Sequence, residues 1–133
     1  MNINWFYYSD TNAPAGEIET FLNAKEWTLR NITRIEDLHQ HFISNKQSVL
    51  FIKANSLFNV YELCQELSVL YPHVYIIMIV PDNMENMRKA MHVGASDMLR
   101  SSADQEEIRE AIVQAKSIWI TVWVKKTFIL STS

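Results

Sequence analysis

The chain has 133 residues, of which 48% are hydrophobic and 20% charged, with two glycines, three prolines and one cysteine. These values predict one globular domain and exclude disordered, collagen-like and disulfide-scaffold classes. The net charge of -3 lacks the basic excess that nucleic-acid binding needs. The single cysteine, Cys64, cannot form an internal disulfide, so we expect a protein of the reducing cytoplasm. Neither a secretory signal nor an apolar run of roughly 18 residues is visible, so we expect no membrane span.

The first half of the chain alternates apolar runs with segments of helical periodicity. The expected order is strand 3–8, helix 14–26, strand 27–32, helix 35–43 and strand 48–54. Residues 48–54 (SVLFIKA) are almost continuously apolar, which favours a central parallel strand covered on both faces.

The second half continues the alternation. The expected order is helix 58–71, strand 74–80, helix 83–93, strand 96–99 and helix 103–116, with Gly94 capping the helix before it. Five strand and helix units in strict alternation predict a doubly wound α/β domain with a parallel sheet and right-handed crossovers.

The last residues, 117–133, leave two alternatives open. The apolar stripe of the preceding helix, which includes Ile108 and Ile112, reaches Trp119 and Val122 at helical spacing, so that helix continues and exposes tryptophans. The β-branched content of residues 118–124 instead favours a sixth strand. We favour a role in self-association, because an exposed apolar patch normally marks a partner surface.

No catalytic or metal-ligating constellation is visible. His39 and His41 are two apart in a predicted helix, so their side chains diverge and do not share a metal. Cys64 lies among apolar helical neighbours, which favours a buried thiol over a nucleophile. We therefore expect no metal, no cofactor and no enzymatic activity.

Residues 90–99 (AMHVGASDML), followed by an acidic amphipathic helix from Asp104, resemble the receiver domain of two-component response regulators. That family ends its fourth helix with an alanine-glycine-alanine stretch, followed by a short strand and a helix. The resemblance covers about residues 2–117. It implies a flavodoxin-like (CheY-like) fold with strand order 2-1-3-4-5 and a site at the carboxyl ends of the strands.

The resemblance also implies a pocket with acids that hold magnesium, a phosphoacceptor aspartate ending strand three, a hydroxyl residue ending strand four and a lysine after strand five. The acid positions fall near Tyr7, Tyr8 and Ser9, which leaves only Asp10 as a late carboxylate. The other positions fall on Lys53 or Ala54, on Ile79 or Val80, and on Ser101-Ser102. We therefore expect a degenerate pocket at Asp10, Lys53, Val80 and Ser101, without a phosphoacceptor aspartate. The Lys53 ammonium either pairs with Asp10 and opposes magnesium, or leaves the sheet for solvent.

The resemblance to receivers extends to a surface. In that family the fourth helix, fifth strand and fifth helix commonly form a dimer face, and methionines offer an adaptable binding surface, although core methionines are commoner. The predicted interaction residues are Met91, Met98, Ile112, Trp119, Val122 and Trp123.

The ending 126–133 (KTFILSTS) resembles the first strand of the ATPase in pilus-assembly proteins of the TadZ and CpaE type, in which a degenerate receiver precedes a Walker A loop. This resemblance implies a receiver-like domain over residues 1–117 and an extension over 118–133 that begins an ATPase domain. The alternatives are one more strand of the domain or a disordered end. The chain itself contains no glycine-rich phosphate loop.

Together these features predict a phosphorylation-independent, receiver-like interaction module. We expect it to form a homodimer and to position or regulate an attached ATPase in pilus or secretion-system assembly. The alternative is a phosphorylatable receiver whose pocket is misaligned here. A small flavodoxin-like enzyme or nucleotide binder is not favoured, because no loop after a strand has the glycines that close approach to phosphate requires.

Overall fold

The protein folds around one five-stranded parallel sheet. The structure is a computed structural model that describes residues 3–9, 11, 13–44, 47–54 and 60–132, with side chains as far as Ile118. The strands are β1 (Asn4–Ser9), β2 (Leu29–Ile32), β3 (Ser48–Lys53), β4 (Val74–Val80) and β5 (Asp97–Arg100), and their order is β2-β1-β3-β4-β5. The helices are α1 (Glu17–Ala24), α2 (Ile35–Ser44), α3 (Val60–Leu70), α4 (Met84–His92) and α5 (Gln105–Thr132). The predicted doubly wound fold and its strand order are confirmed.

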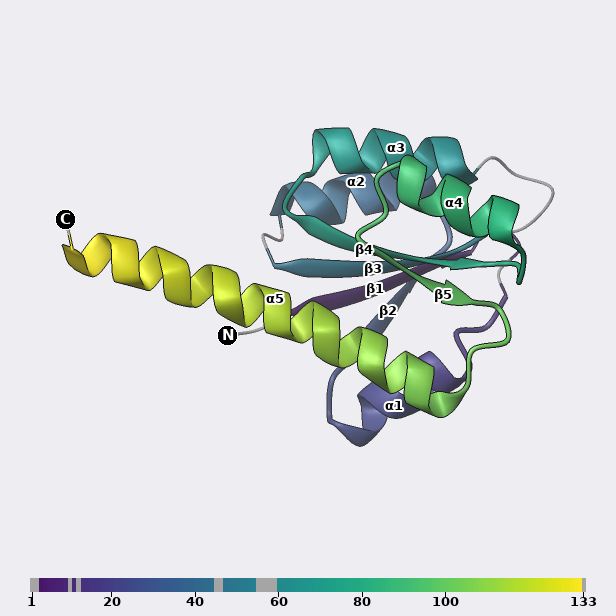
Figure 1. Ribbon diagram of the computed structural model, residues 1–133, viewed down its shortest axis with the longest axis horizontal. Helices are drawn as coiled ribbons and strands as arrows, with labels where there is room; N and C mark the ends of the chain where they lie inside the picture. Colours follow the sequence, from purple (N-terminus) through teal and green to yellow (C-terminus); the bar gives the residue numbers. More distant parts are fainter. Residues whose placement is uncertain (1–2, 10, 12, 45–46, 55–59, 133) are drawn as a thin grey trace.

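Helices cover both faces of the sheet, as Figure 1 shows: α2, α3 and α4 lie on one face, α1 and α5 on the other. Side chains alternate between the two layers along each strand, so Phe6 and Leu50 pack under α2 and α3 whereas Trp5 and Phe51 pack under α1 and α5. β4 is buried along its whole length. The central strands are therefore apolar on both faces, which is the reason their sequence shows no alternation.

The turn after α4 depends on Gly94. This glycine has φ +96, and a Cβ added to it would lie 2.6 Å from Oγ of Ser68 on α3. Its amide and that of Ala95 donate to the carbonyls of Met91 and Ala90, which closes the end of the helix. The cap predicted at Gly94 is confirmed, and it lets the chain approach α3 before entering β5.

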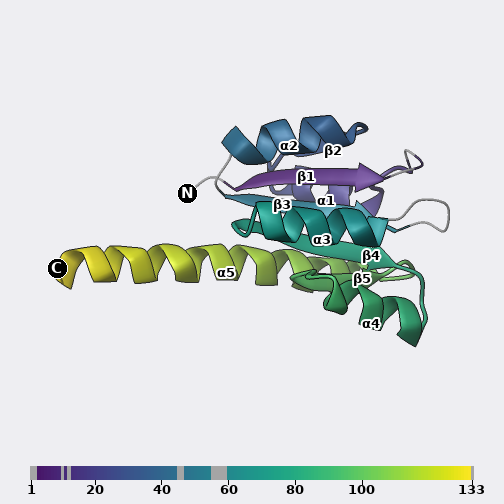
Figure 2. The same ribbon diagram turned by 90° about the horizontal axis from the view of Figure 1, so that it is seen from above.

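α5 is a single helix of 28 residues that extends beyond the sheet (Figure 2). Of the two alternatives for residues 117–133, the continuing helix is confirmed through Thr132. The strands expected at 118–124 and at 126–133 do not form in the described residues through Thr132, because a nucleated helix gains one hydrogen bond per added residue whereas an isolated strand leaves its backbone groups unpaired. Over the residues whose placement the structure gives, no helix meets the length and apolarity that crossing a bilayer requires.

Candidate functional site

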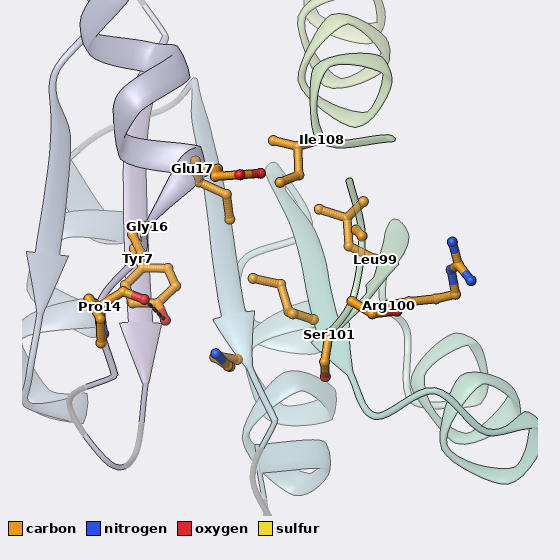
Figure 3. Close-up of a pocket in the computed structure, with 14 residues that line it drawn as sticks. Tyr7, Pro14, Gly16, Glu17, Leu99, Arg100, Ser101 and Ile108 are labelled. Atoms are coloured by element: carbon orange, nitrogen blue, oxygen red, sulfur yellow. Dashed lines mark hydrogen bonds between the residues drawn. The ribbon is translucent and has the colours of Figure 1, made fainter. Parts of the chain in front are cut away.

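A cavity of about 300 Å³ lies at the carboxyl ends of the strands (Figure 3). The sheet register brings these ends together: Ser9 of β1 pairs with Lys53 of β3, and Lys53 pairs with Ile79 of β4. In the doubly wound fold this edge is where ligands bind. The lining residues come from the strand ends, the loop before α1 and the loop between β5 and α5; they are Tyr7, Pro14, Ala15, Gly16, Glu17, Ile18, Lys53, Ile79, Leu99, Arg100, Ser101, Ser102, Ala103 and Ile108.

Lys53 places an ammonium group at the centre of this edge. It is the last residue of β3, it is half-buried, and it lines the cavity. No carboxylate that the structure describes forms an ion pair with Lys53. Asp10, the partner that the sequence suggested, lies outside the described residues, so the pairing stays a prediction.

The polar groups at the end of β1 shape the loop that leads to α1. The buried Ser9 Oγ accepts hydrogen bonds from the backbone amides of Thr11 and Ala13, each at 3.3 Å. The Tyr7 hydroxyl donates to the Pro14 carbonyl at 3.3 Å, and burial raises the pKa of Tyr7. These hydrogen bonds hold the loop that forms one wall of the cavity. The Tyr7 and Ser9 oxygens therefore fix the shape of the cavity and do not serve as ligand-binding groups.

The ends of β4 and β5 are joined through backbone and serine groups. The Val80 carbonyl accepts from both the Ser101 amide at 2.8 Å and the Ser101 hydroxyl at 2.9 Å. The prediction that the Val80 side chain belongs to the pocket is wrong: it is fully buried in the core layer on the α3 and α4 side of the sheet, and Ile79 lines the cavity. The reason is the alternation of a strand, which sends neighbouring side chains to opposite faces. Ser101 lines the cavity.

Asp82 and Arg100, the charged residues near Ser101, form hydrogen bonds with neighbouring side chains. The Ser102 hydroxyl donates to the Asp82 carboxylate, and this hydrogen bond is the main cause that lowers the pKa of Asp82. Arg100 donates from Nε and Nη2 to the Glu107 carboxylate, with an Nη2–Oε1 distance of 2.5 Å. Figure 3 shows the Arg100 side chain directed away from the cavity. The serines and Arg100 thus stabilise the loop after β5.

The described part of the cavity has few of the carboxylate ligands that a hard cation such as Mg²⁺ needs. Within the ranges that the structure describes, no group of three or more histidine, cysteine, aspartate or glutamate residues is placed to hold a metal ion. Among the described residues, the acid that lines the cavity is Glu17. The preceding Gly16 has φ +61 and turns the chain into α1 at the sheet edge, which brings Glu17 to the cavity.

The predicted interaction residues lie in different environments. Met91 on α4 is 49% exposed, and Met98 on β5 is half-buried against the core under α4. The assignment of Ile112 to the surface is wrong: it is 1% exposed and packs between α5 and the sheet, because it belongs to the buried stripe of α5. Trp119, Val122 and Trp123 lie on the helical backbone of α5, but their side chains are outside the described part.

Comparisons with known proteins define the fold. No protein family and no curated protein matches the sequence. Solved structures match over most of the chain, and they are CheY-like receiver domains; the chain therefore has the receiver fold.

The similar solved structures include pilus-assembly proteins. The CheY-like protein tadZ from Pseudomonas aeruginosa PAO1 matches with 22% identity and TM-score 0.67, over 84% of this chain and 99% of that chain. The pilus assembly protein cpaE from Burkholderia thailandensis E264, described as putative, matches with 19% identity and TM-score 0.63, over 87% and 99%. FixJ-N matches with 18% identity and TM-score 0.74, over 88% and 95%.

Proposed function

We propose that this chain is a receiver-like protein-interaction module that works without phosphorylation, self-associates, and positions or regulates an ATPase in a TadZ- or CpaE-like pilus-assembly system. The observation that carries the proposal is Lys53 at the carboxyl end of β3, lining the cavity. In a receiver this position holds the aspartate that accepts the phosphoryl group. A lysine ammonium has no oxygen to form an acyl phosphate and repels the magnesium ion that the transfer requires.

The remaining positions of the cavity support the same proposal. Ile79 occupies the strand-four side of the cavity, where a receiver has a hydroxyl that responds to the phosphoryl group. The Ser101 hydroxyl is engaged with the Val80 carbonyl, and no described cation other than Lys53 and Arg100 lines the cavity. A switch of this type needs a group that changes its interactions on phosphorylation, and these side chains provide none.

A phosphodonor experiment tests the independence from phosphorylation. The full chain is incubated with magnesium and acetyl phosphate, and its intact mass and its solution mass are measured by mass spectrometry and light scattering. We expect no added phosphoryl group and no change of oligomeric state. A phosphoryl group mapped by peptide analysis to an aspartate, with a concurrent change in solution mass, would support the phosphorylatable receiver instead.

Self-association is proposed to use α4, β5 and the part of α5 that extends beyond the sheet. Met91 is half exposed on α4, and the extension is rich in apolar residues. Light scattering at several concentrations is expected to give a dimer that Met91→Glu weakens. Ile43→Glu on α2, where the native side chain is 75% exposed, is the matched control and should leave the mass unchanged. A monomer at every concentration contradicts this part of the proposal.

A further inference from the structure

A second cavity lies between α1 and α5, away from the carboxyl edge of the sheet. Its volume is about 390 Å³, which falls within the range of small-molecule sites. The two helices lie side by side on the same face of the sheet (Figure 1). None of the receiver-site residues discussed above lines this groove except Ile112, which contributes to its floor.

The turn after α1 forms one wall. Glu26 has φ 62, and the amide of Trp27 donates back to the Leu22 carbonyl at 2.9 Å. This left-handed turn brings Trp27 next to Lys25 on the same side of the groove. The Trp27 ring stacks on Trp5 of β1, with centroids 5.5 Å apart and planes at 16°, so the wall is fixed to the core.

α5 forms the opposite wall. Arg109, Val113 and Lys116 follow one another at intervals of four and three residues, so they lie on one strip of the helix. Val113 is 50% exposed, which leaves an apolar surface open to a ligand. The Lys116 ammonium lies 4.7 Å from the centroid of the Trp27 ring and therefore holds a position over the groove.

The charged residues that line the groove are all basic, although the chain carries a net charge of -3. Its three charged lining residues are Lys25, Arg109 and Lys116. Arg109 is engaged by Glu106, to which it donates two hydrogen bonds. Neither lysine has a carboxylate partner in the described part of the chain. The groove thus offers two available ammonium groups above an apolar floor.

We infer that the groove between α1 and α5 binds a small organic anion with an apolar body, such as a medium-chain carboxylate. The apolar part lies against Val113 of α5 and Phe21 of α1, which also lines the groove, and the anionic group lies between Lys25 and Lys116. A neutral apolar ligand lacks the ionic contact, and a hydrophilic anion lacks the apolar one, so both features are needed for binding.

Two fluorescent probes of the same shape test this site in the full chain. Anilinonaphthalene sulfonate carries an anionic group, and phenylnaphthylamine has the same ring system without it. We expect saturable binding of the sulfonate, roughly two- to five-fold weaker in Lys25→Gln and in Lys116→Gln, and weaker at high salt. Lys89→Gln is the matched control, because Lys89 lies 4.6 Å from the centroid of the Tyr61 ring, outside the groove, and it should leave binding unchanged.

Variants on the apolar strip provide a second readout. Val113→Glu adds a like charge beside the anion and is expected to weaken binding of the sulfonate about ten-fold. Val69→Glu on α3, where the native side chain is 75% exposed, is the control. Decanoate should displace the probe and decanol should not, with circular dichroism confirming that every variant is folded.

The inference fails if both probes bind equally, which indicates a purely apolar surface. It also fails if the sulfonate binds equally to the wild type and to the Lys25, Lys116 and Val113 variants, because the probe then binds elsewhere, such as the extension of α5. Displacement by decanol as effective as displacement by decanoate leads to the same conclusion.

Discussion

Replacing Gly94 with alanine probes the contact that lets the turn after α4 approach α3. Two costs follow from the geometry. A side chain at φ +96 costs about 1–2 kcal/mol in backbone strain. The new Cβ also lies 2.6 Å from Oγ of Ser68, whose own hydrogen bond to the Gln65 carbonyl is 2.8 Å, so Ser68 must rotate and lose it, at about 1 kcal/mol. We expect Gly94→Ala to lower the free energy of unfolding by about 2–3 kcal/mol.

A double-mutant cycle separates these two costs. Urea denaturation followed by tryptophan fluorescence gives the free energy of unfolding of each variant. In a Ser68→Ala background the Oγ contact is gone, so the cost of Gly94→Ala should fall by about 1 kcal/mol. Gly16→Ala is the control, since nothing lies within 4 Å of its added Cβ and its cost should not depend on Ser68. A cost of Gly94→Ala that is equal in both backgrounds refutes the steric argument.

Three further predictions concern the core, a thiol and a carboxylate. Ile112→Ala should cost about 2–5 kcal/mol of unfolding free energy, whereas Val113→Ala should cost less than about 0.5 kcal/mol, as urea denaturation would show. Burial raises the pKa of Cys64 to about 11, so a disulfide reagent near neutral pH should react slowly until denaturant is added; fast reaction of the native protein would contradict its burial. Ser102→Ala should raise the pKa of Asp82 towards its ordinary value in a carboxyl NMR titration. Because that pKa is depressed in the fold, any stabilisation it contributes is present above the ordinary pKa of a carboxyl and is lost as the pH falls through the depressed one.

The order of strands and helices was predictable because strands that are covered on both faces appear in the sequence as continuous apolar runs, whereas the helices show helical periodicity. The run 74–80 is apolar at every position, since its side chains pack alternately against the two helical layers. Gly94 was predictable as a cap because the residues before it have helical periodicity and a strand follows directly.

The two errors in the site have different origins. In a strand that is buried along its whole length, such as β4, the sequence leaves open which side chains face the cavity. The assignment of Val80 differs from the observed Ile79 by one residue, which in a strand exchanges the cavity for the core. Ile112 was assigned to the surface although its own stripe identifies it as core. The groove between α1 and α5 was not predictable, because Trp27 and Lys116 are brought together only by the tertiary fold.

The length of α5 gives the molecule a mechanical property. At 1.5 Å per residue, the 28-residue helix is about 42 Å long, and its course from residue 117 to residue 132 accounts for about 24 Å of this. A tilt of about 10° where the helix meets the sheet would move its far end by about 4 Å. A small rotation of the extension, too small to disturb the packing of Ile112 in the core, would therefore move the backbone at Thr132 by a distance comparable to the size of a side chain.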